Sequence, residues 1–116
     1  PAPPKGVIEK IASGMVHDTV FSFIEHLSVE EVAALIINDV DPFEEFKELM
    51  ESPIVGKLVM MKKKWRDRIE EYMNVDNVIY QCWDHAPNLL SVIDSELGRA
   101  WLEKHLNRLK EMLLSD

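Results

Sequence analysis

The side chains best suited to chemistry in this 116-residue sequence include one cysteine and four histidines. Cys82 and His85 are three residues apart, so on a helix they would occupy neighbouring positions of one face. Such a pair could begin a zinc site, or act as a nucleophile with its base. Zinc needs at least one further protein ligand, and Cys82 falls in the middle of an apolar stripe. We therefore expect Cys82 to be a buried core thiol, and we predict no metal site and no cofactor.

Glutamates offer a second kind of chemistry. Glu45 and Glu48 share one face of a predicted helix, and Glu71 is followed three residues later by Asn74 on another. Two such helices could hold Mg²⁺ for the cleavage of a nucleoside triphosphate. The pattern is similar to that of the all-α pyrophosphohydrolases, which carry Glu-x-x-Glu followed by Glu-x-x-Asp. Asn74 stands where that pattern has Asp, which removes one charge from the metal site.

An arginine and a histidine near the C-terminus suggest a hydrolase that acts on RNA. Arg99 and His105 are six residues apart, and this spacing is similar to the Arg–His motif of α-helical ribonuclease domains. The resemblance implies that the arginine stabilises phosphate charge and that the histidine transfers a proton, at a dimer interface. Ala100 departs from the pattern, because a polar residue usually follows the arginine. Six residues also correspond to about 240° around a helix, so the two side chains would not share a face.

Two other site classes are excluded by spacing. The four glycines are isolated, so no P-loop or dinucleotide-binding fingerprint can be drawn. Asp39 and Asp41 look like the start of a calcium-binding EF-hand loop. That loop requires Gly where Glu44 stands and Glu where Met50 stands.

The net charge of −8 is unevenly distributed along the chain. Residues 1–56 contain 11 acidic residues and three lysines, whereas residues 57–116 contain ten of each sign. The acidic excess argues against nonspecific nucleic-acid binding by the whole chain. One possible nucleic-acid patch consists of Lys62, Lys63, Lys64, Arg66 and Arg68. These cations could instead pair with the acidic segment 25–51, within one chain or across a dimer.

Composition sets the class of protein. Hydrophobic residues make up 47% of the chain and charged residues 29%, which is typical of a globular domain. The longest apolar run covers residues 32–37, whereas a membrane-spanning helix needs roughly 20 apolar residues. One cysteine cannot form an internal disulfide, and no signal-peptide pattern is present. We therefore expect a cytoplasmic protein that does not bind membranes.

Apolar residues recur at helical spacing along most of the chain, and we assign no strands. Residues 1–6 are expected to form an extended, proline-rich arm, and residues 7–116 a single helical domain. A first helix is predicted to end at Leu27. Ser28 and Glu31 then predict a capping box at the start of the next helix.

Three further helices are predicted in the middle of the chain. Asp-Pro at 41–42 and Ser-Pro at 52–53 each supply an N-cap followed by proline at the first helical position. Asp76 is expected to cap a third helix, which Pro87 ends. The inward residues of this third helix are predicted to be Val78, Ile79, Cys82, Trp83 and Ala86.

The C-terminal region carries two apolar stripes with Gly98 between them as the expected helix break. The second stripe is spaced like a short coiled-coil seam and consists of Leu102, Leu106, Leu109 and Leu113. It could be buried in the bundle or form a dimer seam, and Trp101, on a different side, could pin the helix to the core. Phe21, opposite the main stripe of the first helix, is a second candidate contact point.

Taken together, these patterns predict an all-α, single-domain bundle of six to seven helices. The predicted function is a non-enzymatic protein–protein interaction or regulatory module, homodimeric through the C-terminal helix or bound to another protein. Two alternatives stay open: a small hydrolase acting on nucleotides or RNA, and nucleic-acid binding through the basic stretch.

Overall fold

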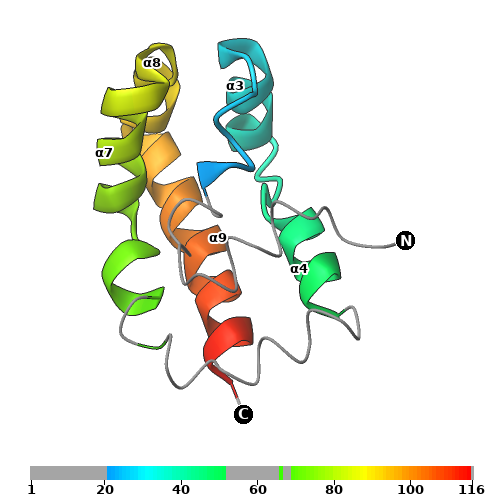
Figure 1. Cartoon of the computed structure of the whole chain (residues 1–116). Coiled ribbons are helices and arrows are strands. Elements are labelled where there is room, and N and C mark those ends of the chain that lie inside the picture. The colour runs from blue at the N-terminus through cyan, green and yellow to red at the C-terminus, as the bar shows by residue number, and fades with distance from the viewer. Residues whose placement is uncertain (1–20, 52–65, 67–68, 116) are drawn as a thin grey trace.

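A computed structural model describes residues 21–51, 66 and 69–115 of the chain. These residues form helices and no strand, as expected of an all-α domain (Figure 1). The longer helices are α3 (Val29–Ile37), α4 (Glu44–Glu51), α7 (Val75–His85) and α9 (Glu96–Leu114). The 3₁₀ turn η1 (Pro87–Leu89) and the short helix α8 (Leu90–Ile93) connect α7 to α9. The fold class predicted from the sequence is confirmed, and no described helix is long and apolar enough to cross a membrane.

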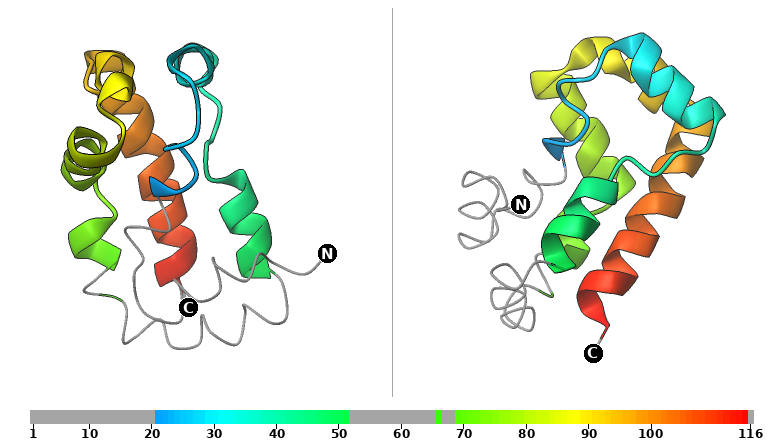
Figure 2. Two further views of the ribbon diagram at one scale, coloured as in Figure 1. Left: turned by 45° about the horizontal axis from the view of Figure 1, so that its top comes forward. Right: turned by 90° about the vertical axis from the view of Figure 1, so that its right-hand side faces the viewer.

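The 19-residue helix α9 is the centre of the described structure. Figures 1 and 2 show α7 on one side of α9, and α3 and α4 on the other. One face of the helix is buried from its first turn to its last, because it meets elements on both sides. Its buried residues are Gly98, Trp101, Leu102, His105, Leu106, Leu109 and Leu113.

The start of α3 follows directly from the local sequence. The Ser28 hydroxyl accepts a hydrogen bond from the Glu31 N–H at 3.1 Å, and the Glu31 carboxylate accepts one from the Ser28 N–H at 3.0 Å. The predicted capping box is therefore confirmed. Ser28 itself is extended, with ψ of 163°, so it cannot continue a preceding helix. Residues 22–27 accordingly form turns rather than the end of the predicted first helix.

Helix α7 begins two residues earlier than predicted, and its buried face differs from the predicted one. Its N-cap is Asn74, whose side chain accepts from the Asn77 N–H at 2.9 Å, and Asp76 lies inside the first turn. Gln81 is buried, with its amide bonded to the Asn77 side chain at 2.8 Å. Trp83, which was expected to point inward, is 64% exposed, so that prediction was wrong. The buried face of α7 therefore includes Gln81 and leaves out Trp83. The side chain of Gln81 can be buried because its amide donates a hydrogen bond to Asn77.

The break between α8 and α9 lies at Ser95 rather than at Gly98. The Ser95 hydroxyl caps α9 by accepting from the Gly98 N–H at 3.0 Å. A Cβ at position 98 would collide with the carbonyl oxygen of Val92 and lie 2.5 Å from that of Ile93. Gly98 is therefore needed for the close approach of α8 to α9, and not for ending a helix.

Some sequence predictions fall outside the described residues. They are the extended arm 1–6, the first predicted helix as far as residue 20, and the first part of the helix that was predicted to begin at residues 52–53. The basic stretch lies there as well, apart from the exposed Arg66.

Candidate functional site

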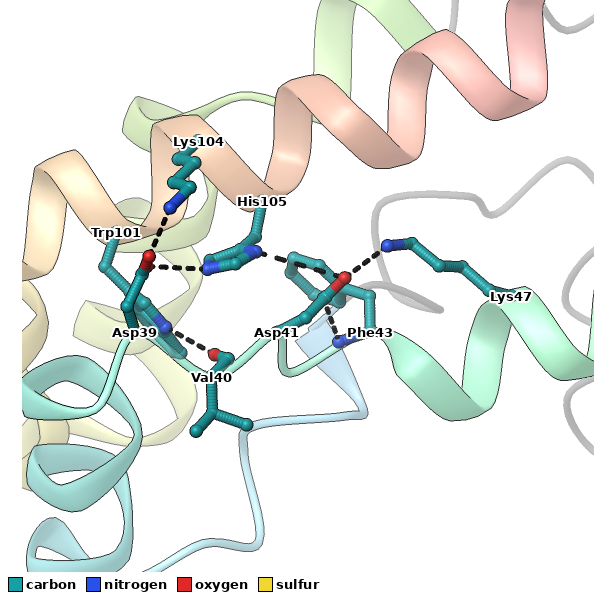
Figure 3. Close-up of polar contacts among 8 residues, drawn as sticks. All are labelled: Asp39, Val40, Asp41, Phe43, Lys47, Trp101, Lys104 and His105. Carbon is teal, nitrogen blue, oxygen red and sulfur yellow. Dashed lines mark hydrogen bonds and ion pairs between the residues drawn. The ribbon is translucent and has the colours of Figure 1, made fainter.

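The largest polar cluster of the described structure lies where the connection between α3 and α4 meets α9 (Figure 3). His105 of α9 is at its centre and is only 2% exposed. Its Nε2 is 2.9 Å from Oδ1 of Asp39, and its Nδ1 is 3.9 Å from Oδ2 of Asp41. The imidazole thus lies between two carboxylates, both supplied by the connection.

Lysines balance both carboxylates. Lys104 of α9 pairs with Asp39, and Lys47 of α4 pairs with Asp41. The hydrogen bond from Lys104, and after it the one from His105, holds the pKa of Asp39 below its usual value. Asp39 has a φ of 52°, a left-handed conformation that Asp adopts more readily than most residues. The backbone therefore turns sharply at the residue that bonds to His105.

Trp101 joins the same connection to α9 one turn earlier. It is 3% exposed, and its indole N–H donates to the carbonyl oxygen of Val40 at 2.7 Å. Its ring lies edge-on to the His105 ring, with centroids 6.3 Å apart. We call Asp39, Asp41, Trp101, Lys104 and His105 the α9 anchor. The predicted role of Trp101 in attaching this helix is confirmed by its burial and its hydrogen bond.

The contacts of the α9 anchor join the α3–α4 connection to α9, and they also occupy the surroundings of the His105 ring. General acid–base catalysis requires that a histidine nitrogen come within hydrogen-bond reach of the reacting group. Both nitrogens of His105 face carboxylates of the same chain, and the ring is buried. Its Nδ1 has no hydrogen-bond partner in the described structure, and the nearest acidic oxygen to it belongs to Asp41.

Arg99 and His105 do not meet within the chain. The Arg99 side chain is 2.8 Å from Asp94 and 3.5 Å from Asp76 of α7. The hydrogen bond to Asp94 raises the pKa of Arg99. His105 instead contacts the α3–α4 connection, on the other side of α9. The separation follows the angle of about 240° that six helical residues create.

The remaining hydrolase and metal candidates are not brought together either. Glu45, Glu48 and Glu71 are all exposed, and no cluster of three metal-ligating side chains occurs within 21–51, 66 and 69–115. Cys82 is buried as predicted, and burial raises the pKa of its thiol to about 11. A thiol with this pKa is protonated at neutral pH, which makes it a poor nucleophile.

The expected dimer residues lie in the core of the chain itself. Leu102, Leu106, Leu109 and Leu113 are buried, and so is Phe21. Neighbouring helices cover the stripe from both sides of α9, which is the within-chain alternative that the sequence left open. In this fold, the leucines and Phe21 do not offer an exposed surface to a second chain.

A shallow cleft of about 410 Å³ lies between the start of α7 and α9. Charges of both signs line it, namely Asp76, Glu103, Arg99 and Lys110, together with two asparagines. Because Arg99 is already paired with Asp76, the cleft has no excess of one charge that would select an ion.

The exposed face of α7 is a feature that the sequence analysis missed. Tyr80 and Trp83 are both 64% exposed and lie three residues apart on the helix. The signal available in the sequence was Gln81, because a helix that buries this position must turn Trp83 outward. Comparison with known protein families, with characterised proteins and with solved structures finds no match to this chain.

Proposed function

We propose that this chain is a protein–protein interaction module without an active site of its own, and that it docks its partner on the outer face of α7. The observation that carries the proposal is the exposure of Tyr80 and Trp83, 64% each, one helical turn apart. Tryptophan and tyrosine are enriched in interfaces and provide much of the binding energy there. Their burial by a partner would remove a large apolar area from water.

The state of the other reactive groups supports the same proposal. His105 is enclosed by Asp39 and Asp41, and Arg99 is paired with Asp94 and Asp76. Within the described residues, these reactive groups are engaged in the chain itself, whereas Tyr80 and Trp83 of α7 are exposed.

Photo-crosslinking tests the proposal. A photoreactive amino acid replaces Tyr80 in cells that naturally contain the protein, and the control carries it at the exposed Glu45 of α4. We expect one discrete adduct from position 80 and none from position 45. An adduct of twice the chain mass would identify a second copy as the partner. Absence of any adduct from position 80 would contradict the proposal.

The captured partner is then purified and titrated by calorimetry. We expect Trp83→Ala to weaken binding about tenfold or more, which corresponds to about 1.4 kcal/mol. Leu97→Ala is the matched control, because Leu97 is also a large exposed side chain but lies on α9. Equal affinities of the wild type and the Trp83→Ala variant would refute docking on α7.

A further inference from the structure

We infer that the α7 face binds a positively charged protein segment, one that presents arginine or lysine side chains to Tyr80 and Trp83. This inference rests on the proposed function and names the chemistry of the partner. It starts from the helical positions of the exposed residues. Among them, Asp76, Tyr80, Trp83 and Asp84 of α7 fall within an arc of about 100° around the helix axis.

Aromatic rings at this face favour a cation. The faces of Trp and Tyr rings carry negative charge density, and a guanidinium or ammonium group is attracted to them. Neither the Tyr80 hydroxyl nor the Trp83 indole N–H has a hydrogen-bond partner in the part of the chain that the structure describes. Both rings are therefore unengaged by the described residues and exposed to a partner.

Carboxylates on the same arc of α7 also favour a positively charged partner. The Asp76 side chain is 91% exposed and shares Arg99 with Asp94, at the longer distance of 3.5 Å. Asp84 is exposed and makes no ion pair with the described residues. An incoming guanidinium can therefore stack on an aromatic ring and bond to a carboxylate beside it. The net charge of −8 would also attract a cationic segment over a longer range.

The same charges disfavour a second copy on this face. Two α7 helices packed against each other would bring Asp76 and Asp84 of one chain close to those of the other. Like charges at an interface cost free energy, whereas a basic partner removes that repulsion. The face is therefore better matched to a different protein than to itself.

The test uses the indole N–H signals of the three tryptophans in ¹H–¹⁵N NMR spectra of the full chain. The Trp83→Phe variant assigns the Trp83 signal. The probe is acetyl-(Gly-Arg)₄-amide, and the control is acetyl-(Gly-Glu)₄-amide. We expect the arginine peptide to shift the Trp83 signal and to leave that of the buried Trp101 in place, and the glutamate peptide to shift neither.

Charge variants then measure the contribution of the carboxylates. We expect Asp84→Asn to weaken binding of the arginine peptide about threefold to tenfold, and added salt to weaken it further. Glu44→Gln is the matched control, because it removes the same charge from α4 and should leave the affinity unchanged.

Three results would overturn the inference. They are equal binding of both peptides, an unmoved Trp83 signal, and a Trp83 shift caused by raising the protein concentration alone. If photo-crosslinking at position 80 still captured another protein, the interaction module would stand and only the positive charge of its partner would be wrong. If crosslinking also failed, the proposed function itself would be wrong.

Discussion

Two tryptophans with the same chemistry have opposite environments in this protein. Trp101 is buried and donates its N–H to Val40, whereas Trp83 faces solvent and has no such acceptor in the described structure. The difference arises from what each helix meets. Among the described elements, α9 has neighbours on both sides, whereas the main contacts of α7 are with η1, α8 and α9. The same side chain therefore stabilises the fold at position 101 and is available for binding at position 83.

The strongest way to break this contrast is Trp101→Ala. It leaves a cavity in the core and removes the donor to Val40, so we expect the free energy of unfolding to fall by about 3–5 kcal/mol. Trp101→Phe separates the two effects, because it keeps most of the volume and loses only the hydrogen bond, at about 1–3 kcal/mol. Urea denaturation followed by circular dichroism measures both variants. A loss below about 1 kcal/mol for Trp101→Ala would show that the α9 anchor does not stabilise the fold.

The next largest effect is expected at Gly98. Alanine there would push α8 away from α9, because the colliding atoms belong to the backbone of Val92 and Ile93. We expect Gly98→Ala to lower the free energy of unfolding by about 3 kcal/mol, although alanine favours helices. Leu97→Ala, at an exposed neighbouring position, should have little effect. Unchanged or higher stability of Gly98→Ala in the same denaturation experiment would show that α8 moves aside without cost.

A pH series distinguishes the charged part of the α9 anchor from its apolar part. The folded-state pKa of Asp39 lies below 3.8, so its ion pairs stabilise the fold above that value and are lost as the pH falls through the folded-state pKa. We expect the stability difference between the wild type and Asp39→Asn to shrink as the pH falls below about 5. Asparagine also tolerates a positive φ, so this variant keeps the backbone geometry. A stability difference that stayed constant down to pH 2.5 would contradict the contribution of the Asp39 ion pairs to stability.

The smallest effect on stability is expected at Trp83. Trp83→Ala should change the free energy of unfolding by less than about 0.5 kcal/mol, because the ring is mostly in water. Combined with the expected loss of partner binding, this result would assign the residue to binding alone. A loss of more than about 2 kcal/mol would place the ring in the core and remove the basis of the proposed function.

Some local signals in the sequence predicted local structure correctly, although the helix boundaries expected at Leu27, Asp76 and Gly98 were wrong. The capping box of Ser28 and Glu31 was confirmed because all its atoms lie within one turn. The burial of Cys82 followed in the same way from apolar spacing on one helix. In the all-α class, such short-range patterns define much of the secondary structure.

Predictions that depended on which side of a helix is covered were less reliable. Trp83 was placed inside because it follows Ile79 at helical spacing, and the buried Gln81 shows that the covered face is rotated away from it. His105 was paired with Arg99 by spacing, yet its actual partner is Asp39, 66 positions away. A sign of its burial was present in the sequence, since His105 lies next to the leucine stripe, about 40° from Leu109 around the helix.

The attachment of the α3–α4 connection to α9 also has a consequence for the order of folding. The Trp101–Val40 and His105–Asp39 bonds close loops of 61 and 66 residues, whereas α7, η1, α8 and α9 contact their neighbours in sequence. Closing a long loop costs more chain entropy than joining adjacent helices. We therefore expect the C-terminal helices to associate first and the connection to dock late. Substitutions at Trp101 would then mainly accelerate unfolding and leave the folding rate almost unchanged.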